Sequence, residues 1–364
     1  MIDVPAIHLT IRNLRLLLLP LTLAFPCEVA SATPRNVVAG HLAASSRQVA
    51  FSVQEEHSID LVVADVRSGS IAELRSSGTR LLFPSFSPDG DRLLVVRQHP
   101  ENGENDLLSC SIDTFHCRRL HTSMDAISSP IEIDEHRILF VSSQLPTDGP
   151  NLRSKYLGFP VNRYINHDIW RLHVGQSPSR VTDFGLYELG DLCVTANNVY
   201  FRGLGPRSDK AVIPKFEALQ RPASDIYRLA VNKASGSISL PEVQLKPLFL
   251  QEGYTFAASV SADESLAALI RTTTNWSGGG YRYDLVIQDL RTGTNRTIEP
   301  TDRLGFSRPV FVGNALFVSE IFDDKYIIKK MLPGDASLRP ALEISDGSII
   351  HAPVIEVTVD DEVR

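Results

Sequence analysis

The sequence predicts an all-β fold made of copies of one unit, and three observations support this. Apolar stretches with the alternation of β-strands recur along the 364 residues, polar turns separate them, and no stretch shows the period of an amphipathic helix. An aspartate followed by an aliphatic residue opens a strand at Asp60, Asp106, Asp168, Asp225 and Asp284, and a looser copy begins at Asp324.

Two kinds of turn recur with these strands. Ser85–Gly90, with the sequence Ser-Phe-Ser-Pro-Asp-Gly, precedes an apolar strand and returns as Ser259–Glu264, while Asp65–Ser70 closely parallels Asp289–Thr294. A period of about 40 to 68 residues is typical of four-stranded propeller blades with loop insertions. A small sheet cannot bury both of its faces alone, whereas sheets stacked around an axis cover one another. The sequence therefore predicts a six-bladed β-propeller of four-stranded antiparallel blades, beginning near Asn36.

Closure of the ring has two interpretations. Residues 349–357 resemble one more first strand, so we expect this C-terminal strand to join the first blade beside Gln48–Val53 and close the ring. In the alternative, Asn36–His41 takes that position and the C-terminal strand begins an incomplete seventh blade.

Residues 1–32 have the pattern of a signal peptide. Arg12 and Arg15 precede the apolar run Leu16–Phe25, and Ala30-Ser31-Ala32 offers a small-residue cleavage site. The run is too short for the roughly 20 residues that span a bilayer, and no later segment is long and apolar enough. We expect residues 33–364 to form a single β-propeller domain that is periplasmic or secreted, with no membrane span in the mature chain.

Cysteine content and charge narrow the chemistry further. Cys110 and Cys117 flank a short hairpin and could face each other, so a disulfide and a pair of packed thiols are both open. We expect Cys193 to be a small buried hydrophobe. The net charge of -7 argues against a nucleic-acid partner, which would require a basic surface.

The chain resembles the repeats of TolB-type propellers. The resemblance rests on Ser87-Pro88-Asp89-Gly90 before an apolar strand, and on the strand openings Asp168-Ile169-Trp170 and Asp225-Ile226-Tyr227. The same repeats occur in the non-catalytic propeller of prolyl-oligopeptidase-like enzymes, but the nucleophile pentapeptide Gly-x-Ser-x-Gly of their hydrolase domain does not occur here. We expect a propeller without the α/β domain that precedes the propeller of TolB, and the resemblance favours a periplasm.

Motifs for catalysis or cofactor binding are not found in the sequence, and we expect no cofactor and no metal site. His41 and His351 fall in candidate inner strands and could hold a metal with a carboxylate, but structural roles explain them better. The strand-opening aspartates occur once in each repeat, so we expect them to stabilise turns by accepting backbone hydrogen bonds.

The strongest functional signal is a set of long insertions. The connections between the second and third strands are long at 143–167, 203–224 and 272–283, which are the third to fifth blades and enlarge one face. Aromatic and basic side chains are common there, whereas the same face of the first two blades carries Glu55, Glu56, Glu101 and Glu104. The candidate binding residues are Tyr156, Phe159, Arg163, Tyr164, Arg207, Lys215, Trp276, Tyr281 and Arg282.

Aromatic and arginine residues on loops of a rigid scaffold are typical of binding surfaces. We therefore expect a monomeric, exported, non-enzymatic propeller that binds a protein or peptide partner, and an acidic segment would suit the basic loops. The alternative is a carbohydrate-binding or carbohydrate-active propeller, with Trp276 and the tyrosines stacking on sugar rings at the mouth of the channel. In a further alternative, the insertions pack on their neighbours and plug the channel.

Overall fold

The computed structural model describes residues 36–54, 58–144, 165–184, 186, 188–204, 224–232, 237–239, 248, 254–273, 282–301, 305–322, 325–345, 349 and 352–360. The predicted signal peptide at residues 1–32 lies outside this part of the chain.

β-Sheets with mainly antiparallel pairing make up the described fold, as the strand alternation predicts. Four of these sheets have four strands each. Their strands are β9 (Ala126–Asp134), β10 (Arg137–Gln144), β11 (Ile165–His173) and β12 (Ser179–Arg180); β13 (Glu188–Val194), β14 (Asn198–Leu204), β15 (Ser224–Asn232) and β16 (Ser237–Ser239); β17 (Tyr254–Val260), β18 (Leu266–Thr273), β19 (Arg282–Asp289) and β20 (Asn295–Ile298); and β21 (Val310–Val312), β22 (Ala315–Ile321), β23 (Lys325–Met331) and β24 (Arg339–Ser345).

A ten-stranded sheet contains the N-terminal part of the fold and the C-terminal strands. Its strands are β1 (Asn36–Ala44), β2 (Gln48–Gln54), β3 (Ile59–Asp65) and β4 (Ile71–Arg75); β5 (Arg80–Phe86), β6 (Arg92–Gln98), β7 (Asn105–Ser111) and β8 (His116–Ser123); and β25 (Val354–Glu356) and β26 (Thr358–Asp360). Within it, β1–β4 and β5–β8 each pair in antiparallel order, and the single pair Ile59–Arg80 connects the two groups.

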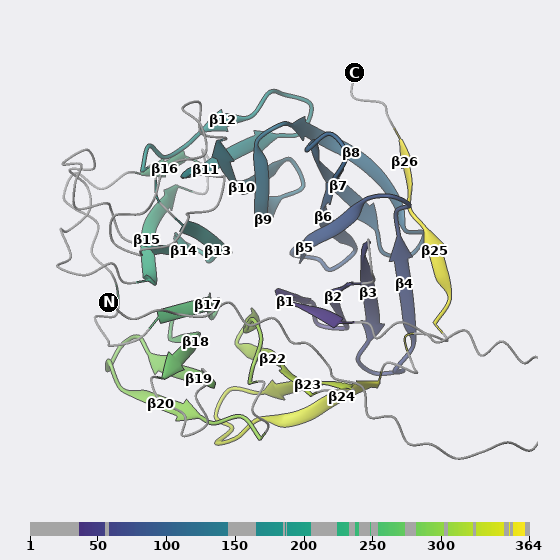
Figure 1. The fold of residues 1–364 in the computed structure, drawn as a ribbon. Coiled ribbons are helices and arrows are strands. Elements are labelled where there is room, and N and C mark those ends of the chain that lie inside the picture. Colours follow the sequence, from purple (N-terminus) through teal and green to yellow (C-terminus); the bar gives the residue numbers. More distant parts are fainter. Residues whose placement is uncertain are drawn as a thin grey trace, which may run out of the picture. The chain divides into compact units, whose positions relative to one another are not determined.

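The first strands of the groups lie next to one another in a closed circuit. Strand β1 contacts β5, and contacts then follow from β5 to β9, β9 to β13, β13 to β17, β17 to β21, and β21 back to β1 (Figure 1). The strands therefore surround a central axis, which is a β-propeller arrangement.

The hydrophobic cores lie between neighbouring groups of strands. One cluster joins Phe51 and Val62 of the first group to Phe317 and Ile328 of the last, and a similar cluster fills each of the other junctions. Each sheet thus covers a face of the next, which is the physical reason for stacking such sheets around an axis.

The C-terminal segment joins the first strand group, as predicted, but its predicted position beside Gln48–Val53 is wrong. The position beside β2 is filled by β1, with Ala43 opposite Ala50, so the C-terminal strand does not complete the first group from inside. Instead β25 pairs in parallel with the outer strand β4, and β26 pairs in parallel with β8 (Figure 1). Ile355 and Val357 pack on the core between the first two groups, so the C-terminal segment fastens both groups from outside.

The repeated turns have the same hydrogen bonds, as the sequence predicts. The Ser87 hydroxyl accepts from the Arg92 amide and the Ser261 hydroxyl accepts from the Leu266 amide, at 2.9 Å in both cases. The other pair also matches, because Asp65 and Asp289 each accept the amides two and three residues ahead at 2.8 to 2.9 Å. Equal sequence at these turns therefore encodes equal backbone geometry.

Cys110 and Cys117 lie opposite each other in the β7–β8 hairpin and form a disulfide. Cys193 is half-buried, and its thiol donates to the Val260 carbonyl at 3.2 Å. Burial raises the pKa of the Cys193 thiol, so it stays protonated at neutral pH.

We expect the double variant Cys110→Ala/Cys117→Ala to lose about 2–3 kcal/mol of unfolding free energy, because the bridge restricts a short loop of the unfolded chain. Denaturant unfolding with and without dithiothreitol measures this. Reductant should lower the stability of the wild type and of Cys193→Ala by the same amount, and should leave the double variant unchanged. Equal stability of wild type and double variant would contradict this prediction.

Candidate functional site

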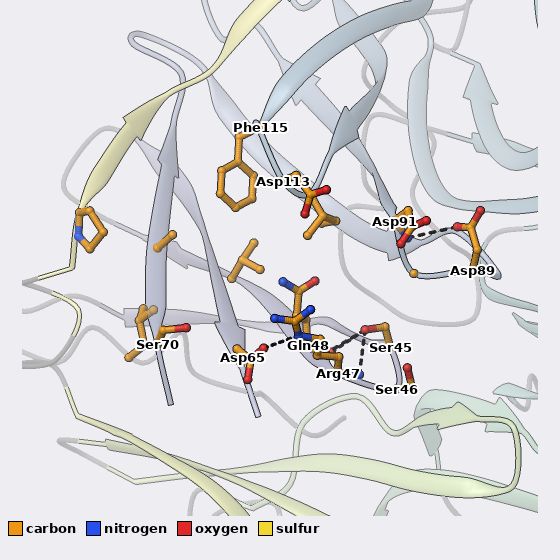
Figure 2. Close-up of a pocket in the computed structure, with 16 residues that line it drawn as sticks. Ser45, Ser46, Arg47, Gln48, Asp65, Ser70, Asp89, Asp91, Asp113 and Phe115 are labelled. Carbon is orange, nitrogen blue, oxygen red and sulfur yellow. Dashed lines mark hydrogen bonds and ion pairs between the residues drawn. The ribbon is translucent and has the colours of Figure 1, made fainter. Parts of the chain in front are cut away.

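A groove of about 490 Å³ lies between the first two strand groups, at the ends of their tight turns. Its lining comes from the β1–β2, β3–β4, β5–β6 and β7–β8 turns. Figure 2 shows these side chains around the hollow: Ser45, Ser46, Arg47, Gln48, Asp65, Ser70, Asp89, Asp91, Asp113 and Phe115. Ile71 and Ile112 add apolar surface to the same wall.

Short hydrogen bonds fix the turns of the groove. The Ser45 hydroxyl accepts the Gln48 amide at 2.9 Å, and the Arg47 Nε donates to the Asp65 Oδ2 at 2.7 Å (Figure 2). The Ser87 hydroxyl donates to the Asp89 Oδ1 at 2.5 Å. The groove is therefore held by rigid turns rather than by long loops.

The lining carries more negative than positive charge. The backbone amide of Ser68 and the Arg47 guanidinium hold the pKa of Asp65 well below its usual range, and the Ser87 hydroxyl lowers the pKa of Asp89. Asp91 and Asp113 are exposed. With Arg47 as the cation among the lining residues, the groove presents an acidic surface to a ligand.

The groove opens at the opposite end of the strands from the surface that the sequence suggested. Successive connections in an antiparallel group lie at alternate ends, so turns after first and third strands share one face and loops after second strands share the other. The groove residues were therefore not identified from the sequence. The acidic Asp89-Gly90-Asp91 turn is a sequence signal for them, but it also fits a purely structural role in the repeat.

The predicted binding residues cannot be placed at a site. Tyr156, Phe159, Arg163, Tyr164, Arg207, Lys215, Trp276 and Tyr281 lie outside the described residues, as does His351. The backbone of Arg282 begins β19 and pairs with Thr273. Nearby on the first strand of this group, Phe256 is 42% exposed and packs edge-on against Tyr283 with ring centroids 5.0 Å apart.

A row of β-bulges lines the central axis. Phe83 of β5, Ser129 of β9 and Asp191 of β13 have positive φ angles of 52°, 47° and 52°, and strand pairing is interrupted at each of them. Left-handed backbone is unfavourable for residues with a Cβ and tends to occur where function or packing requires it. Each bulge changes the direction in which one side chain of its strand points.

An ion-pair network surrounds the bulge at Asp191. The Asp191 carboxylate accepts the Arg202 Nε at 2.8 Å and lies 3.2 Å from the Arg308 Nε, which precedes β21. Arg202 also pairs with Glu188 at 2.9 Å. The Asp191 amide donates to the Ser129 hydroxyl at 3.0 Å, so residues of three strand groups contact Asp191 through its carboxylate or its backbone.

His41 completes the inner row from β1. Its ring lies 4.5 Å from the ring of Phe83, and the residue is 9% exposed. The pKa of His41 is lowered to about 3, mainly by burial and also by the nearby Arg308, while Asp191 opposes both. The imidazole is therefore neutral in the folded protein.

Stability should consequently depend on pH through His41. The unfolded histidine takes up a proton below about pH 6.5, whereas the folded one stays neutral until about pH 3. The free energy of unfolding is therefore unaffected by this group above pH 6.5 and decreases as the pH falls from 6.5 towards 3. Between pH 7 and pH 4, we expect the free energy of unfolding of wild type to fall by about 3 kcal/mol more than that of His41→Gln, as measured by denaturant unfolding. The exposed His136 is the control, and His136→Gln should keep the wild-type slope. A wild-type slope in His41→Gln would contradict this prediction.

The strand-opening aspartates are structural, but they act as buried acceptors rather than at exposed turns. All five are at most 1% exposed. Asp168 accepts the Thr182 hydroxyl at 2.8 Å and the Phe184 amide at 2.6 Å, and Asp60 accepts the Arg75 Nε at 3.0 Å. Asp60 and Asp168 therefore connect the third strand of a group to its fourth strand or to the segment that follows it.

In the part of the chain that the structure describes, no helix is long and apolar enough to cross a bilayer. Among the same residues, no group of three or more histidine, cysteine, aspartate and glutamate side chains is arranged to hold a metal ion.

The fold of this chain is similar to that of solved structures. No family model matches the chain, and no curated protein matches it. The crystal structure of TolB from Acinetobacter baumannii is similar over 79% of this chain and 61% of that one, with 16% identity and a TM-score of 0.53. The crystal structure of puromycin hydrolase is similar over 87% of this chain and 55% of that one, with 10% identity and a TM-score of 0.54.

The chain thus spans less than two thirds of the length of both structures. Identities this low show a shared fold, and the fold is common to TolB and to part of puromycin hydrolase, so it does not by itself show a function. The circuit of first strands, the cores between sheets and the similarity to solved structures lead to one conclusion. The chain has the fold of a TolB-type β-propeller.

Proposed function

We propose that this chain is an exported, non-enzymatic β-propeller that binds a protein or peptide partner. The observation that carries the proposal is the groove of about 490 Å³ on the rigid turns of the first two strand groups. Its volume is in the range of ligand sites, and its mixed polar, acidic and apolar wall suits a peptide segment better than a small apolar molecule. The acidic charge favours a segment that contains lysine or arginine.

The proposal includes the architecture and the place of the protein. Six groups of four strands form the ring as six blades, which is supported by the closed circuit from β1 to β21. Residues 1–32 act as a cleaved signal peptide and residues 33–364 form one domain. The oxidising compartment that this implies suits the disulfide between Cys110 and Cys117.

The loops of blades three to five remain a second proposed contact surface for the same partner or another one. Their basic and aromatic residues suit an acidic segment. The exposed Phe256 beside Tyr283 supports an apolar contribution at the same end of the strands.

The experiment compares four tagged proteins in capture from the exported fraction of the source cells. Wild type is compared with the groove variant Asp91→Lys/Asp113→Lys, with the loop variant Tyr156→Ala/Arg163→Ala/Trp276→Ala, and with a control. The control, Glu101→Lys/Glu135→Lys, makes the same change of net charge at exposed positions away from the groove.

We expect wild type and the control to retain a partner that the groove variant loses at least tenfold, as measured by quantitative mass spectrometry. If only the loop variant lost the partner, the binding site would be on the opposite face, at the loops of blades three to five. Equal recovery by all four proteins would refute partner binding through either surface. Retention of glycans instead of protein would favour the carbohydrate alternative.

A further inference from the structure

A second, smaller cavity lies on the central axis. It has a volume of about 120 Å³ and is lined by residues of β1, β5, β9, β13, β17 and β21, together with Arg308 and Pro309. Arg308 is the charged residue among its described lining residues, and the hydroxyls of Ser85 and Ser259 and the thiol of Cys193 are its neutral polar groups. The wall is otherwise apolar, so the guanidinium dominates the electrostatics of this cavity.

Arg308 has an unfilled hydrogen-bond donor within a charge-balanced network, because Glu188 also pairs with Arg202 beside the shared Asp191 carboxylate. The Arg308 side chain is 13% exposed, and its ion-pair partner among the described residues is the Asp191 Oδ1 at 3.2 Å. That carboxylate already accepts the Arg202 Nε through its other oxygen, at 2.8 Å. The Arg308 Nε makes no hydrogen bond in the described structure, although a guanidinium has five N–H donors.

His41 provides a second unfilled polar group beside this network. The imidazole is nine-tenths buried, and its Nδ1 has no hydrogen-bond partner among the described residues. An unpaired buried nitrogen costs stability unless a ligand or water completes it. His41 and Phe83, whose rings contact each other, are not themselves lining residues, but the residues that follow them in the chain, Leu42 and Pro84, line the cavity.

We propose that the central cavity binds a carboxylate, with the Arg308 guanidinium as the main contact and the His41 imidazole as a second hydrogen-bonding group. A planar carboxylate matches the paired N–H groups of a guanidinium, and a charge-assisted hydrogen bond is stronger than a neutral one. The cavity volume admits a group of the size of acetate or of an aspartate side chain. This site is separate from the groove and does not depend on the proposed function.

The test follows the His41 ring signals by NMR during titration with sodium acetate, with sodium chloride at equal ionic strength as the reference. Comparison with His41→Gln assigns the signals. We expect a saturable shift in wild type with acetate, and affinity at least tenfold weaker in Arg308→Met. The control Arg339→Met changes an exposed arginine and should bind like wild type.

Two further arms keep the result interpretable. Arg308→Lys retains the charge without the planar fork and should bind acetate with intermediate affinity, which separates binding from a folding defect of Arg308→Met. A short peptide with blocked termini and one aspartate distinguishes the sources, because tighter binding than acetate identifies a peptide side chain and weaker binding identifies a free small acid.

Absence of a saturable shift in wild type would overturn the proposal. Equal affinity of wild type and Arg308→Met, or equal shifts with acetate and chloride, would overturn it as well. These outcomes leave capture through the groove untouched, so failure of this site and failure of the proposed function are distinguishable.

Discussion

Replacing Asp106 by asparagine should lower the free energy of unfolding by about 3–5 kcal/mol, because it removes the buried charge that pairs with Arg97 and accepts hydrogen bonds from neighbouring side chains. Asp106 is 1% exposed and pairs with the Arg97 Nη2 at 2.6 Å and the His99 Nε2 at 3.0 Å. The Thr122 hydroxyl donates to its other oxygen at 2.6 Å. The neutral side chain would leave Arg97, with a side chain 11% exposed, without its ion-pair partner.

The pH dependence of this variant gives a second measurement. Burial alone would raise the pKa of Asp106, but hydrogen bonds from Thr122, His99 and Arg97 outweigh it and the pKa is lowered. The contribution of the carboxylate is therefore present above the unfolded value of 3.8 and is lost as the pH falls below it.

Denaturant unfolding at pH 7 and at pH 3.5 tests both statements. The difference in unfolding free energy between wild type and Asp106→Asn should be large at pH 7 and smaller at pH 3.5. Glu135→Gln changes a side chain that is 71% exposed and should stay within about 0.5 kcal/mol of wild type. A loss below about 1 kcal/mol in Asp106→Asn at pH 7 would show that the buried cluster is not a main support of the second strand group.

Removal of the C-terminal strands should have a similarly large effect. Truncation after Ala352 removes Ile355 and Val357 from the core between the first two groups, and it removes the hydrogen bond from the Val357 amide to the Arg75 carbonyl at 2.8 Å. It also exposes the outer edges of β4 and β8 to pairing with other chains. We expect a loss of about 3–5 kcal/mol and increased self-association.

The control for this prediction is truncation after Asp360, which keeps both strands. It retains the bond between the Asp360 carboxylate and the His116 Nε2 at 2.5 Å and should behave like wild type. Thermal unfolding and light scattering provide the measurements. If the chain truncated after Ala352 unfolded at the wild-type temperature and stayed monomeric, this would contradict the prediction that the C-terminal segment stabilises the first two strand groups.

The parts of the fold that were predictable are those encoded by neighbouring residues. The turns at Ser87 and Ser261 have the same side-chain hydrogen bonds because both place a serine and an aspartate two residues apart. Glu264 replaces the glycine of the first copy at a φ of 58°, and hydrogen bonds from Thr195, Asn198 and Tyr200 compensate this backbone conformation. The repeat was therefore recognisable even where its glycine had been lost.

The closure and the groove depend on contacts between distant residues, and the sequence did not reveal them. Residues 36–44 and 354–360 both form strands, and nothing local decides which of them pairs with β2 and which with the outer strand β4. The groove exists only because turns of two adjacent groups meet. The bulges at Phe83 and Asp191 lack the glycine that commonly marks a positive φ, so they were not predicted either.

The central claim is that the groove between the first two strand groups contacts a partner. The most direct measurement places a photo-crosslinking phenylalanine analogue at Asp113 and, as the matched control, at the exposed Glu135, and irradiates the protein in its native compartment. We predict a crosslinked product from position 113 that is not formed from position 135 and is lost when Asp91→Lys is added. No product from position 113, or the same product from both positions, would contradict the claim.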